Sequence, residues 1–467
     1  MAQALHFASA QVEDPRRAEI RHLHARGSYA EVADLAFTWI KENPRDWDIL
    51  RILSDACHLS GYLDEAEKLY AYGFEHEGSV FFLSGLGICA SARGDRASAE
   101  KILREAIRRE PADPRTWMEL SAAHRFEKDD PLAAKLRRQL KRNDIDNRTK
   151  SILHYAMCKA SNDMGKWDQA WHHASEGGRL DDEPFKIESV TEWIDDLYDV
   201  FDEDFLAERP GRGVQSEAPI FIVGAPRSGT TLAERILTGS GEAAAMGEMP
   251  NLPRLCATAR KDDYIKGHTQ NRHGWVRRWR DDAFTAAGQF ILDDVKRRAG
   301  GTMPRFFTDK LPGNLINLGQ ISLLFPKAKI VRMHRNPLDN CVSLYLGRFG
   351  SGHNYTRRVD WLATSYLAYQ GAADFLAPMV NNPVLDVHYE KLVADPEGEG
   401  RRLVEFAGME WTTDVLDPGK TQYASVTRSQ YQVRSKINTS AIGRWRRYKN
   451  KIGPLAEALG IDISSEN

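Results

Sequence analysis

The spacing of apolar residues differs between the two halves of the chain. Up to about residue 185, alanines and larger apolar residues recur at helical spacing, which predicts packed helices. Further on, short continuous apolar runs stand before polar loops at 219–223, at 329–333 and at the start of 384–393. Such runs are typical of strands that are buried on both faces of a parallel sheet. The pattern therefore predicts an all-α first half and an α/β second half.

Glycines recur at a nearly fixed interval in the first half. Gly27, Gly61 and Gly94 lie 34 and 33 residues apart, and alanine-rich sequence of helical spacing follows each of them. A glycine in this position closes one helix, and the small side chains after it face a neighbouring helix. Pro44 and Pro111 end two of the units, because proline cannot continue a helix. The period predicts stacked helix pairs.

These units resemble the tetratricopeptide repeat. The segment 165–170 is similar to one more copy, after a degenerate unit at 128–142. The resemblance covers about the first 180 residues and implies a helical repeat domain. Such a domain offers a concave surface for a peptide or protein acceptor, or for self-association as a homodimer. The alternative is that the helices only cover and solubilise a catalytic domain.

A bridge between the two halves is also predicted. Apolar residues at helical spacing indicate a helix from Ile187 to Phe205, and the segment 208–217 is rich in Gly, Pro and charge. We therefore expect a repeat domain at 1–185, a bridging helix and linker at 186–216, and a second domain at 217–467.

A glycine-bearing loop follows the first apolar run directly. It reads Gly-Ala-Pro-Arg-Ser-Gly-Thr-Thr over 224–231, and apolar residues at helical spacing come next. A strand, such a loop and a helix form a cradle in which backbone N–H groups and the helix dipole face an anion. The glycine spacing matches the nucleoside-triphosphate loop, but Thr230 stands where that loop has its lysine. The charge lies on Arg227 instead, which argues against a kinase or an ATPase.

A second anion-binding element follows the run 329–333. Asn336 and Pro337 are residues that favour a helix start, so a helix is predicted to begin there and to run to about residue 348. Ser343 lies about two turns beyond Asn336 and on the same face. We therefore expect Arg335, at the end of the strand, and Ser343 to hold one phosphate together.

The two motifs together resemble the donor site of sulfotransferases, above all the tyrosylprotein sulfotransferases and the bacterial sulfotransferases with tetratricopeptide repeats. The resemblance covers about residues 217–448, including a late segment at 428–445. It implies a P-loop-like α/β domain with a mostly parallel sheet, helices on both faces, and a site at the carboxyl ends of the strands at 219–223 and 329–333. It also implies 3′-phosphoadenosine-5′-phosphosulfate (PAPS) as donor, 3′-phosphoadenosine-5′-phosphate (PAP) as product, and no metal. The residues implied to bind the donor are Pro226, Arg227, Ser228, Gly229, Thr230, Thr231, Arg335, Ser343, Tyr389, Ser429 and Lys436.

The same resemblance assigns the catalytic groups. Glu248 is similar in position to the general base of the tyrosylprotein enzymes, Lys310 to the lysine that supports the leaving group, and Arg227 completes the set. Two alternatives stay open. Asp309 is either an acid–base group or a partner that fixes the lysine, and His353 is a rival base because cytosolic small-molecule sulfotransferases use a histidine.

The resemblance favours a tyrosine in a peptide or protein as acceptor. A hydroxyl of a glycan, lipid or small molecule is the alternative. A hypothesis of a different class is a repeat-based adaptor built on an inactive sulfotransferase fold.

Charge and composition limit the partners. The 64 Lys and Arg and the 66 Asp and Glu leave a formal net charge of -2, so nothing calls for a nucleic acid. The five cysteines lie far apart without a C-x-x-C pair, which argues against a disulfide framework and a zinc site. No segment has the pattern of a signal peptide or a membrane span. We therefore expect a cytoplasmic enzyme with no membrane partner.

Overall fold

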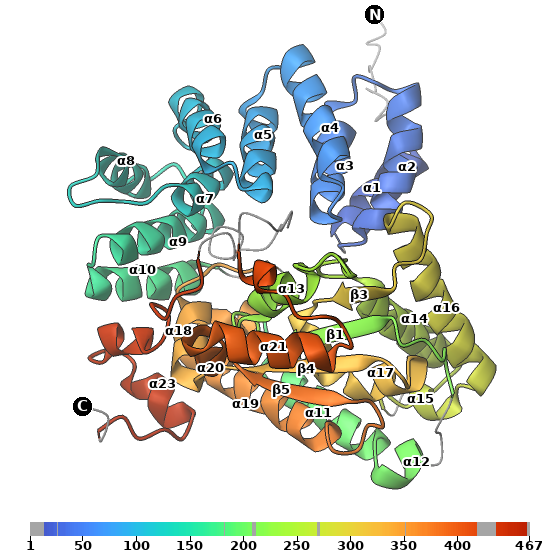
Figure 1. The fold of residues 1–467 in the computed structure, drawn as a ribbon. Coiled ribbons are helices and arrows are strands. Elements are labelled where there is room, and N and C mark those ends of the chain that lie inside the picture. The colour runs from blue at the N-terminus through green and yellow to red at the C-terminus, as the bar shows by residue number, and fades with distance from the viewer. Residues whose placement is uncertain are drawn as a thin grey trace, which may run out of the picture. The chain divides into compact units, whose positions relative to one another are not determined.

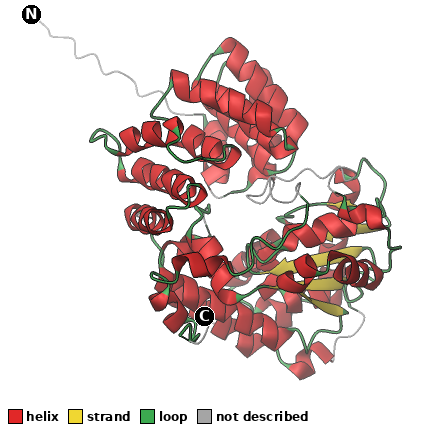
Figure 2. Ribbon diagram, turned by 60° about the vertical axis from the view of Figure 1, so that its left-hand side comes forward, coloured by secondary structure: helices red, strands yellow, loops and turns green. Residues whose placement is uncertain are grey.

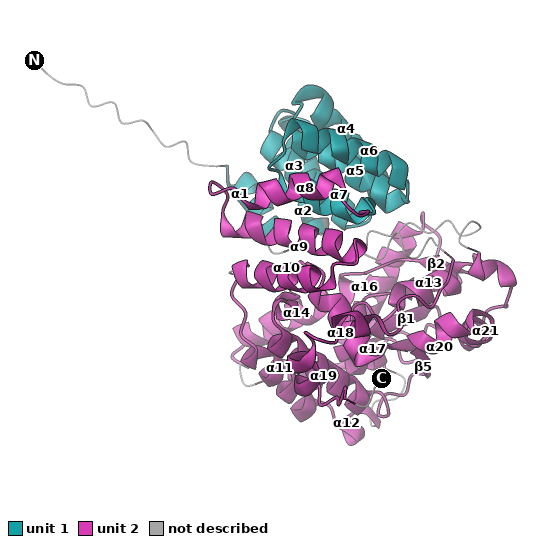
Figure 3. Ribbon diagram, turned by 90° about the vertical axis from the view of Figure 1, so that its left-hand side faces the viewer, with its two compact units in different colours: residues 1–125, 424–430 teal, residues 126–423, 431–467 magenta. Residues whose placement is uncertain are grey.

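The structure is a computed structural model that describes residues 14–25, 27–181, 183–207, 212–268, 271–350, 352–417 and 436–464. The chain divides into two compact units, which Figure 3 colours teal and magenta. Of the described residues, those up to Arg125 belong to unit 1 and those from Phe126 onward belong to unit 2. Each unit is described by itself.

Unit 1 is a series of helices in which each helix packs on the next (Figure 1). Gly27, Gly61 and Gly94 have φ angles of 74°, 84° and 82°, and each follows the end of a helix. This left-handed conformation suits glycine, so the predicted helix-closing role of these residues is confirmed. The helices are α1 (Pro15–Ala25), α2 (Tyr29–Glu42), α3 (Trp47–Leu59), α4 (Leu63–His76), α5 (Val80–Arg93), α6 (Arg96–Arg109) and α7 (Pro114–Ala123).

Unit 2 begins with three more helices, α8 (Pro131–Leu140), α9 (Asn147–Asp163) and α10 (Trp167–Leu180). They pack on the rest of unit 2 through aromatic side chains. The ring of Trp171 lies 4.6 Å from that of Tyr345, and the hydroxyl of Tyr448 donates to Asn162 at 2.6 Å. The compact units thus divide at residue 125, and the predicted bounds of the repeat domain, 1–185, stay a prediction.

The predicted bridging helix is present as two helices, α11 (Glu188–Val200) and α12 (Glu203–Ala207). The break lies at Asp202, whose carboxylate accepts a hydrogen bond from the backbone of Phe205 at 2.7 Å. A side chain that caps a helix start in this way favours a new helix over continuation of the old one.

The centre of unit 2 is a five-stranded parallel sheet in the order β2-β3-β1-β4-β5. The predicted strands at 219–223 and 329–333 are confirmed as β1 and β4, and the third apolar run forms β5. The bounds are β1 (Pro219–Gly224), β2 (Ala243–Ala245), β3 (Phe306–Asp309), β4 (Lys329–His334) and β5 (Val384–His388).

Helices cover both faces of this sheet, as predicted for an α/β domain (Figure 2). All of β1 is buried, and its side chains alternate between two cores. Phe221 and Val223 belong to one core with α11, α14 (Asn251–Ile265), α15 (Trp275–Arg278), α16 (Asp281–Arg298), α17 (Leu318–Leu324) and α19 (Val359–Leu376). Ile220 and Ile222 belong to the other core with α13 (Thr230–Thr238), α20 (Tyr389–Ala394) and α21 (Pro396–Phe406). The remaining elements are α18 (Pro337–Tyr345), α23 (Gly453–Ala458) and the short helices η1 (Pro312–Ile316), η2 (Asn354–Arg357), η3 (Thr413–Leu416) and η4 (Arg444–Tyr448).

Among the described residues, no helix combines the length and the apolar character that a bilayer crossing requires.

Candidate active site

The strand order creates a crevice at the carboxyl ends of β1 and β4. From β1 the chain continues to β2 and β3 on one side of the sheet, and from β4 to β5 on the other side. In parallel α/β sheets, ligands bind where the strand order reverses in this way. The register pairs Gly224 with Met333, so the segments after these two residues leave the sheet side by side.

The loop after β1 turns its carbonyl groups toward neighbouring side chains. Arg227 has a φ of 72°, which is rare outside glycine and typical of functional loops. Its carbonyl oxygen accepts from Nη1 of Arg335 at 2.8 Å, and that of Pro226 accepts from Nδ2 of Asn340 at 3.0 Å. Because α13 begins at Thr230, its first backbone N–H groups lie beside this loop and have no partners within the helix. The strand, loop and helix are arranged as predicted, and anion binding by the loop stays a prediction.

The structure brings the second predicted anion element to the same place. Helix α18 begins at Pro337, as predicted, with Asn336 as its N-cap, and ends at Tyr345 rather than near residue 348. Nε of Arg227 donates to the hydroxyl of Ser343 at 3.2 Å. The loop after β1 therefore forms one contiguous site with Arg335, which follows β4, and with Ser343 of α18.

Tyr389 packs between the loop and the strand-end arginine. The guanidinium of Arg335 lies 4.7 Å from the centre of the Tyr389 ring. A Cβ atom on Gly229 would lie 2.6 Å from that ring, and Gly229 has a φ of 104°. Only glycine fits at this position of the loop. Burial raises the pKa of the Tyr389 hydroxyl, although the positive charges of Arg335, Arg444 and Arg227 act against that rise.

Two buried donor atoms of the site have no hydrogen-bond partner among the described residues, and neither has the acceptor Oδ1 of Asn340. The donors are Oγ of Ser228, a side chain that is 1% exposed, and Nε of Arg335. Buried polar groups are normally satisfied, so such atoms are completed by water or by a ligand. The Ser228 and Arg335 atoms can both donate hydrogen bonds, so they fit the oxygens of an anionic ligand.

Arg444 joins this cluster of cations, although the sequence analysis did not single it out as a site residue. Asp339 positions the turn that carries it, because the carboxylate accepts from the backbone of Gly443 at 2.6 Å and of Trp445 at 2.9 Å. Burial, followed by the charge of Arg447, lowers the pKa of the Arg444 guanidinium, and Arg335 contributes to the same effect. The late segment at 428–445 was the signal that could have identified it.

The two main catalytic candidates form an ion pair. Glu248 follows β2 and Lys310 follows β3, which are parallel neighbours, so both residues leave the same edge of the sheet. Nζ of Lys310 lies 2.8 Å from Oε1 of Glu248. The lysine side chain is 1% exposed and the glutamate side chain 42% exposed. The carboxylate is therefore open to an acceptor, whereas the ammonium is enclosed by protein.

Asp309 contacts the backbone beside Glu248 instead of the lysine ammonium. Its carboxylate accepts from the backbone of Met249 at 3.4 Å and from the amide of Asn314 at 3.4 Å. Burial raises the pKa of Asp309 from 3.8 to about 8, and the charges of Glu234 and Glu248 add to that rise. A carboxyl group with this pKa is mostly protonated at neutral pH.

For most of the other residues predicted for the site, the structure gives a position and a degree of burial. Thr230 and Thr231 are buried in the first turn of α13. His353 stands before η2, with its ring 5.8 Å from those of Phe349 and Tyr355. Lys436 is exposed, and Ser429 lies outside the described residues. The roles assigned to all site residues stay predictions.

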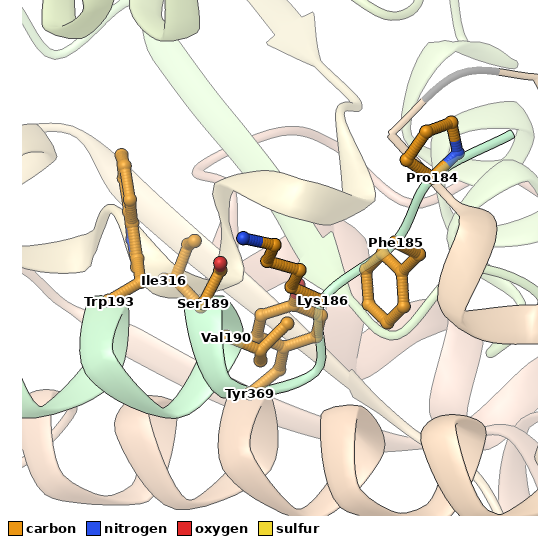
Figure 4. Close-up of a pocket in the computed structure, with 8 residues that line it drawn as sticks. All are labelled: Pro184, Phe185, Lys186, Ser189, Val190, Trp193, Ile316 and Tyr369. Carbon is orange, nitrogen blue, oxygen red and sulfur yellow. The ribbon is translucent and has the colours of Figure 1, made fainter.

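A separate cavity of about 440 Å³ lies between the start of α11, η1 and α19 (Figure 4). Its walls are mostly aromatic and aliphatic, and no residue predicted for the site lines it. The lining residues are Pro184, Phe185, Lys186, Ser189, Val190, Trp193, Ile316 and Tyr369.

The chain is similar to several known proteins. An uncharacterized protein of Aquifex aeolicus is 31% identical over 265 residues, which cover 56% of this chain and 35% of that protein. Protein-tyrosine sulfotransferase 2 of Gallus gallus is 27% identical over 260 residues, which cover 52% of this chain and 69% of that protein. The sulfotransferase domain of the Synechococcus PCC 7002 olefin synthase aligns with a TM-score of 0.36 at 18% identity, over 55% of this chain and 98% of that chain.

The chain thus spans about a third of the length of the first of these relatives. The model of the sulfotransferase family matches residues 219–413, which include the loop after β1, Glu248 and Arg335. This part of the chain is a domain of the sulfotransferase family.

Proposed function

We propose that the protein is a PAPS-dependent sulfotransferase that transfers a sulfuryl group to an acceptor hydroxyl. One observation carries the proposal. Two anion-binding elements that are about 108 residues apart in sequence meet at one strand switch point, where Arg335 donates to the carbonyl of Arg227 and Arg227 donates to Ser343. A donor with anionic groups at both ends requires two such elements.

The residues divide between the two ends of the donor. The loop 226–231 and the first turn of α13 bind the phosphosulfate end, where backbone N–H groups and the hydroxyl of Ser228 face the anion. Arg335, Ser343 and Arg444 bind the 3′-phosphate end. PAPS supplies the sulfuryl group, and the chain supplies the cations and amides that stabilise charge on the departing phosphate. A sulfuryl group carries less charge than a phosphoryl group, which fits a site built from side-chain cations and loop amides.

Glu248 and Lys310 act at the reacting atoms. Glu248 has an exposed carboxylate that accepts the proton of the acceptor hydroxyl. Lys310 and Arg227 donate hydrogen bonds to the phosphate oxygen as negative charge builds on it. We keep Glu248 ahead of His353 as the base, because Glu248 contacts Lys310 directly.

We propose a tyrosine in a peptide or protein as the acceptor. Support comes from relatives named protein-tyrosine sulfotransferase in several animals, each 25% to 28% identical over about half of this chain. We also propose that the helical repeats hold this acceptor, and that the enzyme is cytoplasmic, as its cysteine pattern predicts.

Calorimetry with PAP tests the donor site. We expect micromolar binding by the wild type and loss of that binding in Arg227→Ala and in Arg335→Ala. Arg358→Ala is the control, because Arg358 is exposed and pairs with Asp360. Absence of PAP binding by the wild type, or tighter binding of ATP than of PAP, would contradict the proposal.

Mass spectrometry tests the acceptor. Peptides that contain tyrosine are incubated with PAPS, and the same peptides with phenylalanine in its place are the control. We expect an added sulfuryl group on tyrosine alone. Transfer to a glycan, lipid or small-molecule hydroxyl, but to no peptide, would overturn the choice of acceptor and keep the sulfotransferase.

A further inference from the structure

Glu234 is a buried carboxylate on the helix that begins at the donor loop. It lies one turn beyond Thr230 and Thr231 on α13, and none of its surface is exposed. Burial of an ionisable group is costly unless hydrogen bonds compensate for the lost water. A carboxylate in this place therefore needs specific donors.

The donors of these hydrogen bonds come from the strand edge that carries the catalytic pair. Oε1 of Glu234 accepts from the hydroxyl of Thr308 at 2.8 Å and from the backbone N–H of Gly247 at 3.2 Å. Thr308 lies in β3, two residues before Lys310, and Gly247 directly precedes Glu248. One carboxylate oxygen thus connects α13 to the segments of both catalytic candidates.

The turn that carries Glu248 is otherwise held by β3 and the residue after it. The carbonyl of Gly247 accepts from the backbone of Lys310 at 2.8 Å, and the backbone of Met246 donates to Thr308 at 3.2 Å. The backbone of Met249 donates to Asp309 at 3.4 Å. These bonds fix the turn to the sheet. The bond from Gly247 to Glu234 fixes it to the donor-loop helix.

We propose that Glu234 is a positioning residue that sets the Glu248 carboxylate relative to the donor loop. It acts on the base through the backbone N–H of Gly247, the residue before Glu248. Because Glu234 lies on α13, its bond to Gly247 contributes to the distance between the base and the donor loop. Transfer rates fall steeply when reacting groups are misplaced by about an ångström. This inference rests on the proposed sulfotransferase function.

Two substitutions separate the acceptor role from mere space filling. E234L fills the space without an acceptor oxygen, whereas E234Q keeps an oxygen for Gly247 and Thr308. T308V is a matched variant that removes one donor and leaves the bond from Gly247 intact. We expect E234L to lower kcat at least about tenfold while the Kd for PAP stays within about twofold. E234Q and T308V should each lower kcat by a smaller factor.

A double-substitution cycle identifies the residue through which Glu234 acts. If it acts through the base, E234L adds no further loss of kcat in an E248Q background. An additive loss, a parallel loss of PAP binding, or a wild-type kcat in E234L would each overturn the proposal. If E234L does not fold, E234D replaces it, because aspartate is one methylene too short to reach Gly247 and should show the same split between kcat and Kd.

Hydrogen exchange tests the contact without any activity. Replacement of Glu234 by leucine should speed exchange of the Gly247 amide, followed in peptides that span 246–249. Unchanged exchange would overturn the proposal. A wild type that binds PAP but transfers no sulfuryl group would refute the proposed function, and the exchange result would still decide whether Glu234 holds the turn.

Discussion

Nζ of Lys310 lies 2.8 Å from Oε1 of Glu248, so the proposed leaving-group cation and the proposed base form an ion pair. The lysine is 1% exposed, and a buried ammonium depends on such a partner. In the proposed reaction Lys310 donates to the departing phosphate while Glu248 accepts a proton. The two groups must therefore exchange partners during transfer, which makes their effects on the rate interdependent.

We predict that E248Q lowers kcat about 10²-fold or more, because a general base contributes a factor of this size. K310A should cause a loss of similar order, since it removes a cation from the leaving phosphate. The double variant should lose less than the product of the two single losses. Single-turnover rates measure chemistry, and calorimetry with PAP shows whether the donor site persists. A fully multiplicative loss would contradict the interdependence of the pair.

Replacement of Gly229 by alanine should destroy the donor loop locally. Its Cβ would lie 2.6 Å from the Tyr389 ring, and the φ of 104° is strained for any L-residue. We expect PAP binding to weaken at least about tenfold while the melting temperature changes little. Gly241 also has a positive φ, but a Cβ there meets nothing within 4 Å, so G241A is a matched control for the backbone strain. Equal PAP affinity of G229A and G241A would contradict the contact with Tyr389.

Short apolar runs and loop motifs made much of the sulfotransferase domain predictable. The strands β1 and β4 and the start of α18 follow from local patterns. A continuous apolar run indicates a strand wherever it lies, and Asn336 caps a helix by a hydrogen bond three residues away. These signals need no knowledge of distant contacts.

The contacts that complete the site were not predictable from such patterns. Glu234 appears in the sequence as an ordinary polar residue of a helix. Its burial depends on contacts with β3 and with the turn that carries Gly247 and Glu248. Arg444 joins the site because Asp339, more than 100 residues earlier, holds its turn. The single bridging helix was wrong in detail because Asp202 caps a second helix start. Tertiary contacts decide the first two, whereas Asp202 acts locally, three residues before Phe205.

Arg444 should contribute to donor affinity. We expect R444A to weaken PAP binding about tenfold, or about 1.4 kcal/mol, because a charge-assisted hydrogen bond to phosphate is lost. The exposed neighbour Arg446, whose guanidinium stacks on Trp445, provides the control R446A. The affinity of R444A should also depend less on salt than that of the wild type. Equal affinities of R444A and R446A would remove Arg444 from the site.

His273 should make unit 2 sensitive to acid. Its ring is buried, contacts the carbonyl of Trp193 at 3.2 Å and the amide of Gln320 at 3.4 Å, and burial lowers its pKa from 6.5 to about 4. The unfolded chain therefore takes up this proton first, and stability falls as the pH drops from about 6.5 to about 4, by up to about 3 kcal/mol. H273Q should flatten this part of the pH profile in urea unfolding. An unchanged slope would contradict the buried neutral ring.

Asp309 should have the opposite effect to His273 and lower the stability of the folded protein as the pH rises. Its pKa rises from 3.8 in the unfolded chain to about 8 in the folded protein, mainly through burial. The folded state therefore binds the extra proton between these values, so stability falls as the pH rises from about 4 to about 8 and is level above that. The loss reaches at most about 5 kcal/mol.

In D309N the neutral amide has no such proton to lose. Compared with the wild type, we expect D309N to gain relative stability steadily across this pH range, measured by urea unfolding at fixed ionic strength. The difference between the two proteins is informative even if the amide packs less well, because misplaced packing shifts the curve without changing its slope. If the unfolding free energies of the wild type and D309N run parallel from pH 5 to pH 8, Asp309 is ionised in the folded protein. Its negative charge would then stabilise the neighbouring Lys310 ammonium.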